Sequence, residues 1–188
     1  MKKFVLSLIT PLVISASAWG AVRWEVGLGA GLRTIKDETL RSTYGQGFVY
    51  TPYVNYRVSR TIWVGLEYEG GFVKKARIGI FQEESRLAVE GVQAYMLFGK
   101  EKGAIRPFVK VGAGSFHFEM DIDSPYVQAY NFASSDISIL FGAGLKVMLS
   151  RKLFLSGELK YTALWADPFD DLVDLGGLRL LLGVGIQI

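Results

Sequence analysis

The last twelve residues of the chain, 177–188, alternate between two kinds of side chain with a period of two. One face carries Leu178, Leu180, Leu182, Val184, Ile186 and Ile188, and the other carries Gly177, Arg179, Leu181, Gly183, Gly185 and Gln187. Because successive residues of a strand point to opposite sides, this pattern predicts a β-strand with an apolar face and a polar, glycine-rich face. A helix would bring Arg179 and Gln187 into the apolar stripe, and each interior glycine would cost it about 1 kcal/mol. Such sidedness is typical of transmembrane β-barrels, whose strands cross the bilayer in about 9–11 residues.

Seven earlier segments show a similar alternation, which is enough to close a barrel. We expect strands at residues 23–33, 48–58, 62–72, 87–99, 106–120, 137–148 and 153–162. The connections between them alternate between long polar segments (36–47, 74–86, 121–135 and 167–176) and short links. The chain therefore predicts an all-β, closed, eight-stranded antiparallel up-and-down transmembrane barrel, in which the last strand pairs with the first and leaves no open edge in the hydrocarbon. In such barrels the short turns are periplasmic and the four longer loops extracellular.

Three details of the strands are less regular. Pro52 cannot donate to a β-ladder, so we expect a bulge or a local break there. Phe72 continues the outward face of the third strand. The fourth strand allows two assignments, and we favour the one that turns Val92, Ala94, Met96 and Phe98 outward and leaves Glu90 near the outer rim.

Two runs of the sequence resemble a known family. The run 106–114, Arg-Pro-Phe-Val-Lys-Val-Gly-Ala-Gly, and the hairpin from Phe141 to Tyr161 are similar to strands of the outer-membrane β-barrel superfamily that includes OmpA-like and OmpX-like domains. The resemblance implies an eight-stranded barrel in the outer membrane of a Gram-negative cell envelope, inserted by the barrel-assembly machinery. Members usually end in an aromatic residue, whereas this chain ends in Ile188.

The N-terminal residues predict a secretory signal peptide. Lys2 and Lys3 precede an apolar segment, 4–14, and small residues follow at 16–18. We expect residues 1–18 to be removed, with cleavage as late as residue 20 as the alternative, and residues 19–188 to form the barrel. Removing the two lysines from the 21 basic residues leaves 19 against 18 acidic ones. This near-neutral balance argues against a nucleic-acid partner, and the absence of cysteine excludes thiol chemistry.

Charged residues on the inward face predict what fills the barrel. An eight-stranded barrel has an interior just wide enough for side chains, and unpaired buried charges are costly. We therefore expect a network of ion pairs in the lumen, formed by Arg23, Glu25, Arg33, Glu67, Glu69, Lys110, Lys146, Glu158, Lys160 and Arg179. A barrel with a filled lumen and a structural role in the cell envelope follows. The alternative is a narrow pore for small solutes.

A catalytic site is a weaker hypothesis. Ser115, His117 and Glu119 share the outward face of the fifth strand, and lipid A deacylases are similar in carrying a Ser/His/acid set on the barrel exterior. Neighbours on one strand face lie about 7 Å apart, however, which is long for a Ser–His hydrogen bond. We expect these to be polar residues at headgroup depth, and we expect no enzyme activity and no cofactor.

Loop charges suggest contacts with ions and lipids. Asp167, Asp170, Asp171 and Asp174 are candidate ligands for a divalent cation, but their spacing is not that of an EF-hand, so a solvated loop is expected. Lys74, Lys75, Arg77 and Arg86 suit lipopolysaccharide phosphates or simple solvation. The expected partners are outer-membrane lipids, lipopolysaccharide and the assembly machinery, with the barrel as a monomer. A soluble lipocalin-type barrel is the competing architecture, but its apolar face would point inward.

Overall fold

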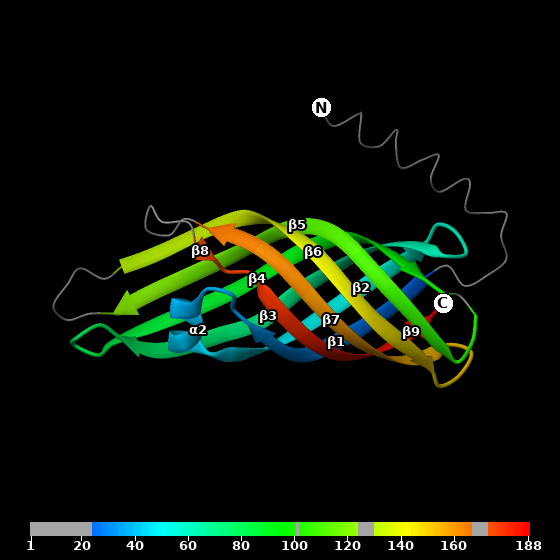
Figure 1. Cartoon of the computed structure of the whole chain (residues 1–188), viewed down its shortest axis with the longest axis horizontal. Helices are drawn as coiled ribbons and strands as arrows, with labels where there is room; N and C mark the ends of the chain where they lie inside the picture. The colour runs from blue at the N-terminus through cyan, green and yellow to red at the C-terminus, as the bar shows by residue number, and fades with distance from the viewer. Residues whose placement is uncertain (1–23, 101, 124–129, 167–172) are drawn as a thin grey trace, which may run out of the picture.

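A computed structural model of the chain describes residues 24–100, 102–123, 130–166 and 173–188, and shows a closed antiparallel barrel (Figure 1). The signal peptide predicted at 1–18 lies outside the described residues. In chain order the elements are β1 (Trp24–Thr34), α2 (Glu38–Tyr44), β2 (Gln46–Arg57), β3 (Ile62–Ile78), β4 (Glu83–Gly99), β5 (Ile105–Asp123), β6 (Tyr130–Met148), β7 (Leu153–Ala166), β8 (Val173–Asp174) and β9 (Gly177–Gln187).

The barrel closes between its last and first long strands. β9 pairs with β7 on one side and with β1 on the other, in a continuous register from Glu25↔Gln187 to Arg33↔Arg179. The two-residue β8 adds only to the end of β7. The eight-stranded up-and-down prediction is thus confirmed. Among the described residues, no helix is long and apolar enough to span a membrane.

The outward face is apolar over the part of each strand that lies in the membrane. Exposed side chains there include Trp24, Leu28, Leu66, Val92, Val109, Phe141, Leu155, Leu182 and Val184. β4 takes the favoured assignment, with Val92 and Met96 exposed and Tyr95 and Leu97 buried. Two aromatic pairs stand on this surface, Trp24–Tyr56 with ring centroids 4.8 Å apart and Tyr50–Tyr68 at 6.1 Å. Aromatic residues at the two edges of an apolar band are typical of membrane interfaces.

Two of the predicted loops are largely strand. β3 continues to Ile78 and β4 begins at Glu83, so the segment predicted as a loop at 74–86 is a hairpin with a short turn. Likewise β5 extends to Asp123 and β6 begins at Tyr130, where a loop was predicted from 121 to 135. The loop predictions were wrong because polar residues on outward positions resemble loop composition. The first loop, 36–47, contains the short helix α2.

The extended ends of these strands form a four-stranded projection, which we call the extracellular sheet (residues 72–78, 83–90, 115–123 and 130–136). β2 pairs with β3 only as far as Tyr50↔Gly70, and β7 pairs with β6 only from Leu164↔Ser138. Beyond those pairs β3, β4, β5 and β6 continue together, and Figure 1 shows them reaching past the other strands at the left. The structure therefore has a complete barrel around the apolar band and half a barrel wall beyond it.

A bulge separates the two parts of β3. The register between β3 and β4 shifts between Glu69 and Phe72, and Gly71 adopts a φ of 91°, a conformation that glycine tolerates best. One extra residue reverses the alternation. Phe72 consequently points inward with no exposed surface, so its predicted outward position was wrong.

The prediction at Pro52 holds in part. The β1–β2 register is continuous through Leu28↔Pro52. On the other side, β2 and β3 have the same register at Tyr50 and at Tyr53, but Thr51 and Pro52 have no ladder partners. Pro52 therefore marks a local break without a bulge, because its missing N–H removes a hydrogen bond but inserts no residue.

Candidate functional site: the filled lumen and its apolar cap

The centre of the lumen is organised around the carboxylate of Glu67, which projects from β3. Its Oε2 lies 2.8 Å from Nζ of Lys110 on β5, and its Oε1 lies 2.6 Å from Nζ of Lys160 on β7. Lys110 also contacts Oε1 of Glu158 at 2.7 Å. Glu67 is only 2% exposed and Lys160 is fully buried. These contacts connect three strands across the interior and neutralise charges that would be costly if buried alone.

A second cluster lies toward the extracellular end, around Glu69. Nη1 of Arg33 lies 3.0 Å from its Oε1, Nε of Arg179 lies 2.7 Å from the carboxylate, and Nζ of Lys160 lies 3.3 Å from Oε2. Lys160 therefore joins this cluster to the central one. Arg33 donates from Nη2 to the carbonyl of Leu175 at 2.7 Å. The side chains of Arg33, Glu69 and Arg179 are all fully buried.

Aromatic rings complete the surroundings of the two arginines. Both guanidinium groups lie 5.4 Å from the ring centroid of Phe116, and Arg33 is equally close to Phe72. A guanidinium over a ring face gains a favourable electrostatic contact without needing a hydrogen-bond acceptor. The two rings therefore separate the charged lumen from the apolar residues above it.

A third cluster occupies the periplasmic end of the lumen. Lys146 is hydrogen-bonded to Oε2 of Glu25, which also accepts from Asn55 at 3.1 Å, and Gln187 donates to Oε1 at 2.7 Å. Tyr95 donates to the amide oxygen of Asn55 at 2.6 Å. The cluster thus uses neutral polar side chains to occupy the remaining lone pairs of one buried carboxylate.

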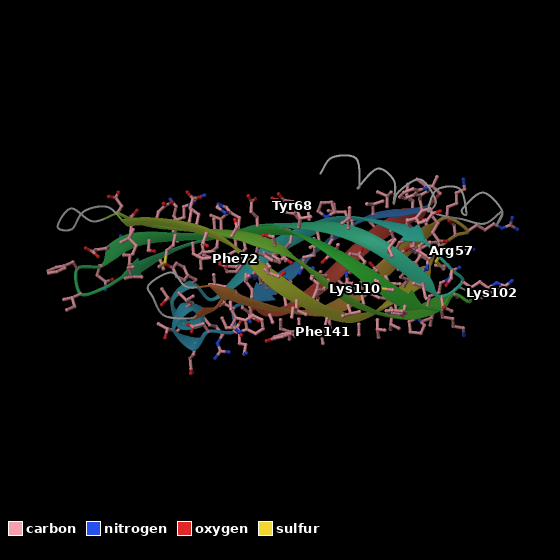
Figure 2. The ribbon with its side chains drawn as sticks, turned by 90° about the horizontal axis from the view of Figure 1, so that it is seen from above. Arg57, Tyr68, Phe72, Lys102, Lys110 and Phe141 are labelled. Carbon is pink, nitrogen blue, oxygen red and sulfur yellow. The ribbon has the colours of Figure 1, made fainter. Side chains whose placement is uncertain are left out.

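The structure places the predicted lumen residues as follows. Each of the described ones takes part in an ion pair inside the barrel. They are Glu25, Arg33, Glu67, Glu69, Lys110, Lys146, Glu158, Lys160 and Arg179. Arg23 lies outside the described residues. Sequence reasoning missed the neutral members Asn55, Tyr95, Thr162 and Gln187, although their inward position follows from the same alternation. Along the long axis in Figure 2, Lys110 lies between Phe72 and Lys102.

Above the charged clusters the interior becomes apolar. We call this region the apolar cap. Its buried members are Ile35, Tyr44, Val49, Phe72, Leu87, Val89, Phe116, Phe118, Met120, Leu164, Leu175 and Leu181. They come from the extracellular sheet, from the adjoining parts of β2, β7 and β9, from the β1–β2 connection with α2, and from the β8–β9 segment. The sequence analysis did not predict this cluster, because it expected charged and polar side chains on the inward face of every strand; only Tyr44 and Leu175 lie in segments it assigned to loops.

Three polar contacts hold the β1–β2 connection over the cap. The phenol of Tyr44 at the end of α2 lies 2.5 Å from the hydroxyl of Ser85 on β4. Burial disfavours the phenolate and raises the pKa of Tyr44, against a smaller opposing effect of the Ser85 hydrogen bond. Nζ of Lys36 lies 2.8 Å from Asp174, and the backbone N–H of Lys36 donates to the carbonyl of Gly176 at 2.8 Å. The hydrogen bond and charge of Asp174 raise the pKa of Lys36.

The proposed catalytic residues are not assembled by the fold. Nδ1 of His117 lies 3.1 Å from the hydroxyl of Ser135 on β6, rather than from that of Ser115. Oε2 of Glu119 lies 3.6 Å from Nη1 of Arg86, which also lies 3.3 Å from Asp121. All three residues are on the outward face of β5. Ser115 pairs with Val92 at the edge of the apolar band, and His117 and Glu119 lie beyond it. Glu119 is therefore part of a surface ion-pair group with Arg86.

Of the four aspartates predicted as candidate metal ligands, one lies within the described residues. Asp167, Asp170 and Asp171 lie outside the described residues, and Asp174 is paired with Lys36. Within the described residues there is no group of three or more acidic or histidine side chains that could hold a metal ion. Arg86 is engaged by Glu119 and Asp121, whereas Lys75 and Arg77 are exposed on the outward side of β3.

Comparison with known proteins agrees with this architecture. The model of the outer membrane protein beta-barrel domain matches residues 4–184. The chain belongs to this family. A search of curated protein sequences finds no match. Membership places the protein in the outer membrane as an integral β-barrel.

Solved structures of outer-membrane barrels share the fold at low sequence identity. Neisserial surface protein A has a TM-score of 0.63 and 13% identity, with 88% of this chain and 97% of that one covered. Ail, the attachment invasion locus protein of Yersinia pestis, solved with the heparin analogue sucrose octasulfate, has a TM-score of 0.60, 15% identity, and coverage of 89% and 100%. The N-terminal barrel domain of Pseudomonas aeruginosa OprF has a TM-score of 0.50 and 18% identity, with 89% of this chain and 100% of that one covered. At these identities the likeness concerns the fold.

Proposed function

We propose that this outer-membrane barrel is a structural and surface-presenting component of the cell envelope, and that its lumen does not conduct. The observation that carries the proposal is the burial of the central ion pairs. At most 2% of the surface of each charged residue at that level is exposed, namely of Glu67, Glu69, Lys160, Arg33 and Arg179. The side chains there therefore leave no room around them for water. The apolar cap adds a second barrier that an ion could cross only by losing its hydration.

Planar-bilayer recording of the purified protein tests this proposal. We expect no discrete conductance steps, from either the unmodified chain or a variant that weakens the cap, Leu87→Ala, because the ion pairs below would still fill the lumen. Discrete steps from the unmodified protein would establish the narrow pore instead. Detergent-only preparations and a heat-unfolded sample serve as controls for contaminating porins.

The absence of catalytic activity is part of the same proposal. It is supported by the separation of Ser115 from His117, whose ring contacts Ser135, and by the pairing of Glu119 with Arg86. The test is mass spectrometry of lipid A from cells with and without the protein, where we expect the same acyl pattern. A missing acyl chain that reappears in a His117→Ala strain would overturn it.

The surroundings of the barrel follow from its surface. We propose that the chain is exported with residues 1–18 as a cleaved signal, inserted by the barrel-assembly machinery, and embedded as a monomer among outer-membrane lipids and lipopolysaccharide. The exposed apolar band supports lipid contact around the whole circumference. Mass determination of the mature protein in membrane extracts tests the cleavage site and the oligomeric state together. A mass that still includes residues 1–18, or the mass of a dimer, would contradict the proposal.

The part of the molecule that faces the exterior is the extracellular sheet. We propose that its role is to present side chains away from the cell surface, since four strands continue beyond the membrane in register. Ail, which has the same fold, was solved with a heparin analogue bound. Whole-cell protease protection provides the test. Cleavage within the β3–β4 hairpin of intact cells is expected, and protection of that hairpin would contradict the orientation.

A further inference from the structure

Basic residues gather at the periplasmic end of the barrel, in the connections β2–β3, β4–β5 and β6–β7. We call this edge the basic rim (residues 57–61, 99–106 and 149–152). It contains seven lysines and arginines and a single acidic residue, Glu101. The opposite end instead contains thirteen acidic residues and six basic ones, in residues 36–47, 72–90, 115–136 and 166–176. Neither the filled lumen nor the apolar cap explains this segregation of charge along the barrel.

Backbone hydrogen bonds join the three connections into one edge of the barrel wall. The N–H of Gly99 donates to the carbonyl of Thr61 at 2.9 Å, and the N–H of Met148 donates to the carbonyl of Ala104 at 2.8 Å. The last residue of β9 donates from its N–H to the carbonyl of Lys152 at 2.7 Å. The cations of the rim therefore belong to one continuous surface.

Two turns of the rim have the same construction and carry an arginine next to the serine that holds them. The serine hydroxyl accepts from the backbone N–H groups two and three residues later, at 3.3 and 3.2 Å for Ser59 and at 3.2 and 3.0 Å for Ser150. The following residues, Arg60 and Arg151, are exposed, and within the described residues neither guanidinium has an ion-pair partner. The turns are stabilised without these two side chains, which are thus available for another molecule.

Some cations of the rim are engaged within the protein. Arg57 lies 5.7 Å from the ring centroid of Trp63, and Arg106 donates from Nε to the carbonyl of Gly103 at 3.1 Å. Figure 2 shows Arg57 and Lys102 at the same end of the long axis. Pairing of Glu101 and of the Ile188 carboxylate with two of the seven cations would still leave five. The rim therefore carries an excess of positive charge.

The basic rim adjoins the lipid-facing band. Val58 is 55% exposed and Leu149 is 56% exposed, and each precedes the arginine of its turn by two residues. Two residues of extended chain span roughly 7 Å. The headgroup layer of a bilayer is about 5–8 Å thick on each side of the hydrocarbon. Arg60 and Arg151 therefore lie at the depth of lipid headgroups, where a guanidinium can bind a phosphate through two parallel N–H donors.

We propose that the basic rim binds anionic phospholipids of the barrel's own membrane, with Arg60 and Arg151 on the headgroup phosphates and the acyl chains against Val58 and Leu149. A lipid suits this surface better than a soluble acidic partner, because the arginines adjoin the band that hydrocarbon already covers. A headgroup with a net negative charge suits it better than a zwitterionic one, whose own amine the excess of cations would repel. The inference goes beyond the proposed function, because a filled lumen would be unchanged if the rim had no lipid preference.

Native mass spectrometry of the full barrel in mild detergent tests the preference. The barrel is mixed with equal amounts of phosphatidylglycerol and phosphatidylethanolamine that have the same acyl chains. We expect phosphatidylglycerol to be retained preferentially. The double variant Arg60→Gln, Arg151→Gln should lower its retention roughly tenfold or more, since each cation near headgroups contributes roughly fivefold. Retention of phosphatidylethanolamine should not change.

The double variant Lys75→Gln, Arg77→Gln is the matched control, because it removes the same charge from exposed side chains at the opposite end of the barrel. We expect it to retain phosphatidylglycerol as the unmodified protein does. A loss equal to that of the rim variant would overturn the proposal in favour of attraction to the protein's charge as a whole. Equal retention of the two lipids by the unmodified barrel would also overturn it, and would favour a soluble acidic partner.

A fluorescent label on the rim locates the lipid. The chain contains no cysteine, so Thr61→Cys carries a single fluorophore beside Arg60 in nanodiscs of phosphatidylcholine. We expect stronger quenching by phosphatidylglycerol than by phosphatidylcholine when each carries a nitroxide near the top of its acyl chain, and equal quenching once Arg60→Gln is added. Leu178→Cys, at the other end of the lipid-facing band, should be quenched equally by both lipids. Equal quenching at residue 61 in the protein that retains Arg60 would overturn the proposal.

Both leaflets of a nanodisc have the same composition, so the result does not depend on which end of the barrel faces the periplasm. Heat-modifiable gel mobility verifies that each variant is folded. Conductance of the same samples reports on the lumen separately, so a failure of the lipid preference and a failure of the filled lumen are distinguishable.

Discussion

The interior of the barrel within the membrane and the interior of the extracellular sheet are built from the same strands with opposite chemistry. On β5, the inward Lys110 faces the ionic lumen, whereas the inward Phe116 and Phe118 face the apolar cap. The outward face changes in the other direction, from Val109 and Val111 to His117 and Glu119. The period of two continues throughout, and only its polarity is reversed.

The difference shows which solvent each wall faces. Where lipid surrounds the barrel, apolar side chains gain by pointing outward and the charges must pair with one another inside. Where water surrounds the sheet, the same strands bury their apolar side chains against the cap in the ordinary way. The reversal occurs between Val92↔Ser115 and Glu90↔His117, the level at which Tyr68 donates to Glu90 at 2.6 Å. We infer that this level is the outer boundary of the hydrocarbon.

The largest expected effect concerns the ionic interior. Glu67→Met removes one carboxylate that two lysines share, and leaves Lys160 with only Glu69. Breaking a buried pair typically costs about 3–5 kcal/mol. We expect a loss of that size in the free energy of unfolding, measured by urea titration of the protein folded into lipid vesicles. The exposed Glu84→Gln on β4 is the control and should change stability by less than about 0.5 kcal/mol. Equal effects of the two variants would show that the lumen pairs contribute nothing.

A smaller loss is expected in the apolar cap. Leu87, on the β4 part of the extracellular sheet, is buried in the apolar cap. Leu87→Ala should lower the free energy of unfolding by about 2–3 kcal/mol, the lower part of the range for such truncations, because the open end of the barrel can partly collapse. The same urea titration measures it. A loss larger than that of Glu67→Met would reverse the ranking of the two interiors.

Glycines in the lumen wall provide the third test. A Cβ added at Gly31 would lie 1.9 Å from the carbonyl oxygen of Leu180, a backbone atom that cannot move away. Gly31→Ala should therefore cost about 1–3 kcal/mol, as overpacking usually does. At the outward Gly157 the nearest atom, in Leu182, is 3.8 Å away, so Gly157→Ala is the matched control and should be neutral. A neutral Gly31→Ala would mean that β1 and β9 are not in close contact there.

The smallest effect concerns the fastening of the cap. Because the pKa of Lys36 is raised above its usual value by Asp174, the ion pair contributes its full stability at neutral pH, and on the alkaline side that contribution is lost as the pH rises through the raised pKa. The ¹³Cε shift of Lys36 should accordingly titrate later than that of an ordinary lysine. In Asp174→Asn it should titrate at a lower pH than in the unmodified protein, because the largest cause of the raised pKa is removed. Identical titrations in the two proteins would contradict the contact.

The contrast also explains how much the sequence could reveal. The membrane section was predictable because each strand has one apolar face and one polar face. In the last strand, Leu178 and every second residue up to Ile188 identify the outward face, and Arg179 identifies the inward face. Closure of β9 on β1 followed from the need to satisfy backbone groups in hydrocarbon. The residues that meet in the lumen could be named, but their pairing depends on strand tilt and register, which no single strand pattern contains.

The extracellular sheet could not be recognised by the same reasoning. Lys75, Arg77 and Glu84 alternate with Ala76 and Ser85, a pattern that is polar enough to resemble a loop. The extra residue at Gly70–Gly71 then reverses the parity, so Phe72 was assigned to the wrong face. One strand can pass from lipid to water only in the folded protein in its membrane. A reading of the alternation that assumes lipid along the whole outward face therefore misses this change.

The reversal of polarity along β5 is the central claim, and a nitroxide scan of its outward positions tests it most directly. Single cysteines at Val109, Val111, Ala113, His117 and Glu119, in the barrel reconstituted in bilayers, would be probed for collision with oxygen and with a water-soluble nickel complex. We predict that the oxygen accessibility is high from 109 to 113, and that the nickel accessibility is high at 117 and 119. Oxygen accessibility that remained high through Glu119, or nickel accessibility already high at Val111, would contradict the account.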